Sequence, residues 1–518
     1  MDDISYRSYS KFDLRIVILC AMAGTLMQGI DSTIANVALP YMQGSLSASR
    51  DQITWVLTSY IVSAAVMTTP VGWLASRFGR KRFLMLSIAG FTIASMLCGA
   101  AQTLEQMIFF RFLQGCFGAS LSPLAQSIMF DLYPPQKRGS IMAIWGIGVM
   151  VGPIIGPTLG GYLTDMYDWR WVFYVNLPIG IAAVTGLWMC FRDTEHDASL
   201  KFDWFGFTLL ASGIAALQLM LDRGTTKDWF SSPEIVIEAL IAGLGIYLFV
   251  VHLLTGKGSF MRVEVFKDRN FISAMSLMFV LGMIMLASSA LLPPYLQNLG
   301  GYSVTDTGLL MAPRGAGTMI SMVLAGQIAM RVDARLLMGT GVALLSWSLF
   351  QMSQWTPNVP WQWLAITTVT QGIGMGLIFV PMSLVAYATL PARLRTDGSA
   401  VINLVRNIGS AIGVSVTTTI LANDIQTAHA QLAQHASRFN RALGVNAPSM
   451  SWNPNMPFGA AQLDGVIQVN AQMIAYANDF FFMFLLSLAA IVVVALIKRP
   501  DMMVLSPSSS HSQYEMME

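Results

Sequence analysis

Long apolar stretches, separated by short polar segments, run through the whole chain. A transmembrane helix needs about 20 mostly apolar residues to cross the hydrocarbon core of a bilayer. Fourteen stretches meet that length, and they begin near Leu14, Ile53, Phe83, Met107, Ser140, Val172, Trp204, Ile235, Phe271, Thr305, Leu336, Trp361, Gly398 and Phe480. The pattern predicts an all-α polytopic membrane protein.

Composition agrees with a membrane protein. Of 518 residues, 54% are hydrophobic and 11% are charged, whereas about a quarter of residues are charged in soluble domains. The net charge of +2 gives no reason to expect a nucleic-acid partner. The sequence has no phosphate-binding Gly-x-x-x-x-Gly-Lys-Ser/Thr loop and no clustered catalytic or metal-ligand set. We therefore expect that the protein is not an enzyme and holds no cofactor or metal. Any energy that it needs is expected to come from an ion gradient rather than from nucleotide hydrolysis.

Lys and Arg are unevenly divided between the connecting segments. With the N-terminus inside, the inner segments hold 21 of the 30 cations, the outer segments hold six, and three lie within helices. Because Lys and Arg collect on the cytoplasmic side of short loops, both termini are expected in the cytoplasm.

Three short motifs occur twice in the same order. The matched pairs are Gly72 and Gly326, Arg77 and Arg331, Gln114 and Gln371, Pro134 and Pro391, and Arg138 and Arg395, at offsets of 254 to 257. Duplicated halves around a central path are typical of alternating-access transporters. The expected divisions are an N-terminus (1–13), a six-helix half (14–190), a linker with two extra helices (191–270), a second half (271–498) with an outer loop (422–478), and a tail (499–518).

On these features the chain resembles a 14-helix member of the major facilitator superfamily. The segment GWLASRFGRKR (72–82) is similar to the superfamily's gating loop, which implies that Gly72, Arg77, Gly79 and Arg80 act as a conformational switch. The pattern usually has an Asp where this chain has Ser76, so the usual charge is missing from this position.

A glycine- and proline-rich helix matches the antiporter signature of the superfamily. Its motif residues are Gly148, Gly152, Pro153, Gly156 and Pro157. Prolines bend a helix and glycines permit close helix packing, so a merely structural role is also consistent with this segment.

The segments DSTIANVALP (31–40) and WRWVFYVNLPIG (169–180) resemble EmrB/QacA-type drug:proton antiporters, and the long outer loop resembles the EmrB branch. The resemblance implies efflux of hydrophobic compounds in exchange for protons across the cell inner membrane. It also implies a periplasmic adaptor and an outer-membrane channel as partners. An exporter of one physiological amphiphile or siderophore is the alternative.

Charged residues inside a span are costly and mark functional candidates. Asp31 and Arg111 are both expected about 10–12 Å below the outer surface, so their side chains could meet. The resemblance links the arginine to proton transfer, and a static structural pair is the alternative. Glu238 and Asp479, which lie near the ends of their predicted helices, are expected at the membrane interface.

Four residues are candidates for a substrate cavity: Asn36, Gln114, Arg314 and Arg406. The two arginines could instead pair with backbone carbonyls. The polar outer loop 422–478 is interpreted either as a partly helical spacer or as a docking surface for an external partner.

Overall fold

A computed structural model describes residues 9–192, 197–256, 259–329, 331–356, 359–435 and 457–497. These ranges fold into helices with short connections and contain no β-strand. The α-helices are α1 (Lys11–Ser45), α2 (Arg50–Ile53), α3 (Trp55–Thr68), α4 (Val71–Phe78), α5 (Arg80–Ala100), α6 (Leu104–Gly118), α7 (Leu121–Asp131), α8 (Arg138–Met166), α9 (Trp171–Tyr174), α10 (Asn176–Cys190), α11 (Trp204–Arg223), α12 (Pro233–Thr255), α13 (Arg269–Pro294), α14 (Val304–Ile328), α15 (Ala334–Met352), α16 (Trp361–Ala388), α17 (Arg395–His435) and α19 (Pro457–Leu496).

The prediction of an all-α polytopic membrane protein is confirmed. In the described part of the chain, 11 helices are long and apolar enough to cross a membrane, or 12 if α3 and α4, bent by 60°, form one span. The segments α6–α7 and α15 lie where two further spans are predicted, but they are not among these 12. The count of fourteen therefore stays a prediction.

Polar N-caps begin several of the helices where an apolar stretch starts. The capping side chain accepts a hydrogen bond from a backbone N–H of the first turn, which would otherwise lack a partner. The capping residues include Ser10 of α1, Thr103 of α6, Asp203 of α11, Asp268 of α13 and Ser303 of α14. These local signals mark where those five helices begin.

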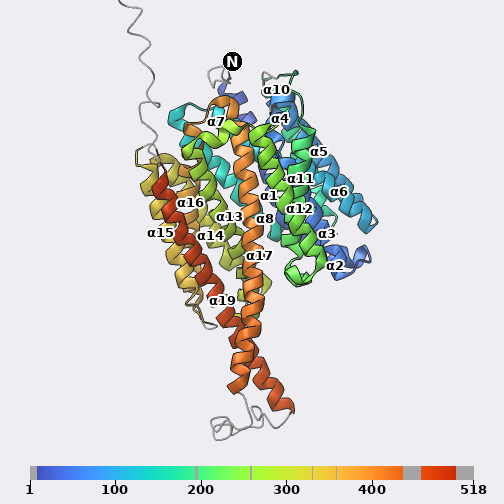
Figure 1. Ribbon diagram of the computed structural model, residues 1–518, viewed down its shortest axis with the longest axis vertical. Helices are drawn as coiled ribbons and strands as arrows, with labels where there is room; N and C mark the ends of the chain where they lie inside the picture. The colour runs from blue at the N-terminus through green and yellow to red at the C-terminus, as the bar shows by residue number, and fades with distance from the viewer. Residues whose placement is uncertain are drawn as a thin grey trace, which may run out of the picture.

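The helices form two groups, with α11 lying against both and α12 packed on α11. Helices α1 to α10 form the first group, and α13 to α19 form the second (Figure 1). The extra pair contacts the first group where Thr58 of α3 donates a hydrogen bond to Asp222 of α11. It contacts the second where Ser415 of α17 donates to the Leu221 carbonyl at 2.9 Å. The expected domain boundaries remain a prediction.

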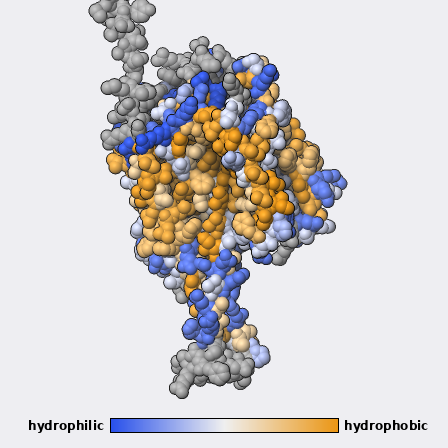
Figure 2. Space-filling view, viewed as in Figure 1, coloured by the Kyte–Doolittle hydropathy of each residue, from blue (hydrophilic) through white to orange (hydrophobic). Residues whose placement is uncertain are grey.

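The two ends of the molecule differ in character. One end, at the top of Figure 1, carries the segments RFGRKR (77–82) and PPQKRGS (134–140); we call it the basic end. Figure 2 shows an apolar band below it, where the bundle is widest. At the opposite end α17 and α19 continue together beyond the other helices as a two-helix stalk (Figure 1).

Within the predicted outer loop 422–478, residues 436–456 lie outside the described part of the chain.

Candidate functional site

Asp31 lies in a fully buried cluster of hydrogen bonds between α1 and α6. The Arg111 guanidinium donates to Asp31 Oδ2 at 2.6 Å, and Gln114 Nε2 donates to Asp31 Oδ1 at 2.8 Å. Arg111 also donates to Gln114 Oε1 at 2.8 Å. The exposed fractions of Asp31, Arg111 and Gln114 are 0%, 1% and 0%. The structure thus brings the two predicted charges together and adds a third member, Gln114, which the sequence analysis assigns to the substrate cavity.

Groups from α3 and α9 complete the surroundings of Arg111. Its Nε donates to the Val56 carbonyl at 3.2 Å, and its guanidinium lies 4.3 Å from the Tyr60 ring centre and 5.7 Å from that of Phe173. Burial of a charge is tolerated when it is paired and hydrogen-bonded, and aromatic faces add further attraction. Loss of the Asp31 charge would therefore leave a buried, uncompensated guanidinium.

The segment WRWVFYVNLPIG positions one of these aromatic rings. Asn176 Nδ2 donates to Ser95 Oγ at 3.0 Å, and Ser95 Oγ donates to the Phe173 carbonyl at 2.8 Å. Both polar side chains are buried, with exposed fractions of 1% and 0%. This chain of hydrogen bonds joins α5 to the break between α9 and α10, and it holds Phe173 next to Arg111.

The glycines of the predicted antiporter motif pack against the part of α1 that carries Asp31. A Cβ on Gly152 would lie 2.7 Å from the backbone of Gly29, and a Cβ on Gly156 would overlap the Thr33 side chain. Gly148 is less confined, because its Cβ would meet only the end of the Met22 side chain at 3.1 Å. Close approach of α8 to α1 therefore depends on glycine. Pro157 is exposed on α8, and the side chain of Pro153 lies outside what the structure describes.

At the basic end, an ionic cluster joins the two groups of helices. Arg80 of α5 donates to Asp131 of α7 at 2.6 Å, and Arg395 of α17 donates to the other oxygen of the same carboxylate. Arg80 also reaches the Ala392 carbonyl at 3.4 Å. Ser76 leaves the loop without its usual acid, but Asp131 provides a carboxylate that bridges the groups.

Two glycines of the expected conformational switch, Gly72 and Gly79, lie at this junction, where the backbone leaves little freedom for another residue type. Gly72 faces Asp397 of α17 so closely that any Cβ would overlap the carboxylate. Gly79 has a φ of 85°, a left-handed conformation that favours glycine, and it separates α4 from α5. Arg77 has a different position: it lines a surface groove and lies near Asp197 of the linker.

A buried polar network extends this junction into the bundle. Gln126 Oε1 accepts hydrogen bonds from Tyr387 at 3.1 Å and from Asn403 at 3.4 Å. Ser399 of α17 donates to the Pro123 carbonyl of α7 at 2.8 Å. Packed helices and hydrogen bonds therefore close the basic half of the interface between the two groups. The sequence analysis identified none of these hydrogen bonds.

The second group holds a version of the Asp31 cluster without charges. Gln371, the repeat partner of Gln114, donates to Ser288 of α13 at 3.3 Å. Ser288 lies 257 residues after Asp31, and Thr368 lies 257 residues after Arg111. The repeat therefore keeps the glutamine contact between equivalent helices, and only the first group has the ion pair at these positions.

The expected cavity residues lie in different surroundings. Arg314 is 8% exposed and donates to Ser289 Oγ at 3.1 Å and to the Met285 carbonyl at 3.2 Å, as the backbone-pairing alternative expected. Asn36 is exposed, Arg406 is half-buried, and Gln114 is buried beside Asp31. No hydrogen bond joins any two of these four side chains in the described residues.

The expectation that Asp479 lies near the end of its helix is wrong. Asp479 is 0% exposed and lies inside α19, which extends well beyond the predicted start of that span. Its carboxylate is buried, because α19 continues into the stalk and packs against α17. Glu238 lies near the start of α12, 3.7 Å from Arg223, and its place at the membrane interface stays a prediction.

Comparison with known proteins identifies the class. Residues 21–414 match the family model "Major Facilitator Superfamily". The "Multidrug export protein EmrB" of Escherichia coli (strain K12) is 35% identical over 476 residues, covering 91% of this chain and 92% of that protein. The "Fatty acid resistance protein FarB" of Neisseria gonorrhoeae is 33% identical, covering 84% and 86%.

Solved structures support the same fold. The proton:xylose symporter XylE aligns with a TM-score of 0.57 at 14% identity, over 90% of this chain and 95% of its own.

The chain is a multi-span membrane transporter and not an enzyme. It belongs to the major facilitator superfamily and, within it, to the EmrB branch.

Proposed function

We propose that this protein exports hydrophobic or amphiphilic compounds, multidrug substrates included, across the cell inner membrane in exchange for protons. The observation that carries the proposal is the Asp31–Arg111–Gln114 cluster, a buried ion pair between two helices of the first group. The relatives named as multidrug export proteins support export. The proposed orientation places the basic end in the cytoplasm and the stalk outside, with both termini cytoplasmic.

Proton exchange can act through the bonds of Asp31. Protonation would remove the negative charge that holds the Arg111 guanidinium at 2.6 Å, while Gln114 could still donate to the neutral carboxyl group. A buried cation without its partner is strongly unfavourable, so the cluster would rearrange or admit water or substrate. Because Gly152 and Gly156 pack on the same part of α1, such a rearrangement would be transmitted to α8.

A polar face of α1 supports a substrate path beside this cluster. Ser32 and Asn36 are exposed and Gln28 is half-buried. They are spaced four residues apart and so share one face of the helix. The basic half of the interface is closed by the Asp131 and Gln126 contacts, and in the proposed orientation this closed end faces the cytoplasm. We infer that substrate reaches the α1 face after those contacts open.

The proposal is tested with purified protein in proteoliposomes under an imposed pH gradient. Asp31→Asn should abolish substrate movement driven by the gradient and substrate-induced proton movement. The matched control is Asp165→Asn, which removes an exposed acid near the C-terminal end of α8 and should keep both activities. Gradient-driven transport at the parent rate in Asp31→Asn would disprove coupling through this residue.

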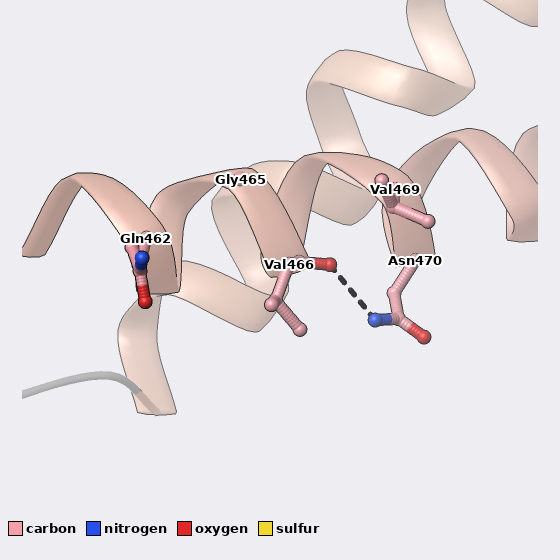
Figure 3. Close-up of a pocket in the computed structure, with 5 residues that line it drawn as sticks. All are labelled: Gln462, Gly465, Val466, Val469 and Asn470. Carbon is pink, nitrogen blue, oxygen red and sulfur yellow. Dashed lines mark hydrogen bonds between the residues drawn. The ribbon is translucent and has the colours of Figure 1, made fainter. Parts of the chain in front are cut away.

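We further propose that the stalk engages a periplasmic adaptor, which in turn joins an outer-membrane channel. Figure 3 shows a shallow groove on α19, lined by Gln462, Gly465, Val466, Val469 and Asn470. Val466 and Val469 are 36% and 41% exposed, and a Cβ on Gly465 would meet nothing within 4 Å. An exposed apolar face next to an open glycine could receive a partner helix.

Adaptor binding is tested by co-purification from cells that express a candidate adaptor. Val469→Glu should reduce recovery of the adaptor, because it places a charge on the apolar face of the groove. The matched control is Asn470→Gln, which keeps the polarity of the neighbouring position. Full adaptor recovery with Val469→Glu would contradict docking at this face and favour the spacer interpretation.

A second candidate function is export of one anionic amphiphile. The half-buried Arg406, for which the described residues provide no ion-pair partner, favours it, and one relative is named as a fatty acid resistance protein. A resistance panel in an efflux-deficient strain separates the candidates: a dedicated exporter protects against one chemical class, and a multidrug exporter against several.

A further inference from the structure

The two linkers of the extra helix pair meet at the basic end. Phe202, in the linker before α11, packs against Trp73 of α4 with ring centres 4.7 Å apart. Trp73 Nε1 also donates to the Lys201 carbonyl at 3.2 Å. Phe260, in the linker after α12, lies with its ring centre 5.9 Å from that of Phe202. We call Trp73, Phe202 and Phe260 the aromatic hub.

The aromatic hub attaches the second linker firmly to the extra helix pair and, through Trp73, to the first group. Phe260 is 4% exposed, and its ring centre also lies 5.8 Å from that of Phe249 of α12 and 6.1 Å from that of Phe207 of α11. A buried aromatic side chain is among the costliest to withdraw from a folded protein, because it loses both burial and packing. Phe260 is therefore one attachment point of this linker.

Arg262, two residues further along, attaches the same linker to the second group. Its Nε lies 3.6 Å from Asp397 Oδ2 of α17, and its guanidinium donates to the Arg393 carbonyl at 3.4 Å. Asp397 is the buried residue whose carboxylate faces Gly72 of α4, and Arg80 of the ionic cluster also lies near it. The linker thus reaches α17 at the point where α17 meets α4.

The connection between these two attachment points is short. A chain spans at most about 3.3–3.6 Å per residue, so the Cα atoms of Phe260 and Arg262 are no more than about 7 Å apart. Glu264 makes an ion pair at 2.7 Å, but both of its side chains are more than half exposed, and such pairs contribute little. The next buried attachment is Val265, in the 3-10 helix η5 (Val263–Lys267), at most about 17 Å from Phe260. Release of Arg262 would therefore more than double the reach of the connection.

We propose that Arg262 limits how far the basic end opens, as a positioning residue that keeps the second linker short while it contacts Asp397. Separation of α4 from α17 pulls on the connection between the aromatic hub and α17. Wider opening requires Arg262 to leave Asp397, because Phe260 is the more deeply buried of the two attachments. The extra helix pair thereby becomes a third part of the gate. This proposal goes beyond the proposed function and rests on it only in that the basic end opens during transport.

Opening is measured as the rate at which a maleimide labels a cysteine introduced at the buried Ala400 of α17. The assay uses the full-length protein in detergent, with its four native cysteines replaced by serine. Arg262→Gln should speed labelling about fivefold, as expected for the loss of one partly exposed ion pair. Arg262→Lys keeps a cation for Asp397 and should label nearly as slowly as the parent. The control is Arg269→Gln, which removes an exposed cation at the start of α13 and should leave the rate unchanged.

The two attachments act in series, and this gives a readout that general destabilisation would not produce. Phe260→Ala should also speed labelling. The double variant Phe260→Ala/Arg262→Gln should label no faster than the faster single variant, because a connection released at one end restrains nothing at the other. Unfolding in denaturant shows which variants are folded, and if the Phe260 variants do not fold, the Arg262 series alone decides.

Three results would overturn the proposal: the parent labelling rate in Arg262→Gln, equal acceleration in Arg269→Gln, or multiplied rate increases in the folded double variant. The assay contains no substrate and no proton gradient. A failure of proton-coupled export would therefore leave its result unaffected, and parent labelling in every variant would remove the role of Arg262 without touching the proposed function.

Discussion

The buried pair of Asp31 and Arg111 makes a quantitative prediction that separates structural support from proton coupling. Removing one partner of a buried ion pair costs about 3–5 kcal/mol, because the remaining charge stays buried without compensation. Asp31→Asn keeps the volume of the side chain and an acceptor for Gln114, but leaves the Arg111 charge unpaired. We therefore expect a loss of about 3 kcal/mol in the free energy of unfolding.

The double variant Asp31→Asn/Arg111→Gln should recover part of this loss. Both side chains are then neutral, and the amide introduced at position 111 can still donate to the amide oxygen introduced at position 31 or to Gln114. The free energy of unfolding of the double variant should exceed the value predicted by adding the two single losses. The expected excess is about 2 kcal/mol, within the range of coupling energies measured for contacting residues. Unfolding of the detergent-purified proteins in denaturant gives the four free energies.

Transport by the same four proteins gives the second readout. If Asp31 carries the proton, the double variant regains stability but not gradient-driven transport. Additive free energies would refute the energetic coupling of the pair. Recovery of both stability and gradient-driven transport in the double variant would show that the pair has a structural role and carries no proton.

Three further predictions concern the neighbouring elements. Gly152→Ala should reduce transport severely, because its Cβ would lie 2.7 Å from the α1 backbone, whereas Gly148→Ala should be mild; initial rates in proteoliposomes compare them. Asp131→Asn removes the carboxylate shared by two arginines and should open the basic end, seen as faster labelling of a cysteine introduced at the buried Ala400; unchanged labelling would count against the gate. Deletion of residues 440–452 should spare substrate transport in proteoliposomes while lowering adaptor recovery, and loss of transport in the isolated protein would contradict a purely external role.

The sequence by itself determined much of the architecture. Hydropathy is local, because each span must satisfy the bilayer along its own length, so the all-α membrane class followed from composition and stretch length. The depth of a residue along a helix is also local, which is why Asp31 and Arg111 could be assigned the same level from the sequence. The repeat pairs Gln114 with Gln371, and the structure places both glutamines at contacts between equivalent helices.

Only the tertiary structure decided which distant residues share a site. Asp131 meets Arg395 across 264 residues, and Gln126 meets Asn403 across 277, and neither contact follows from any periodicity. Ser76 could be recognised as a missing acid, but the pairing of Asp131 with Arg80 and Arg395 depends on how α5, α7 and α17 pack. The extent of the stalk and the burial of Asp479 were likewise settled by packing between α17 and α19. Hydropathy and spacing describe each helix separately, whereas the ionic cluster at the basic end exists only where α5, α7 and α17 meet.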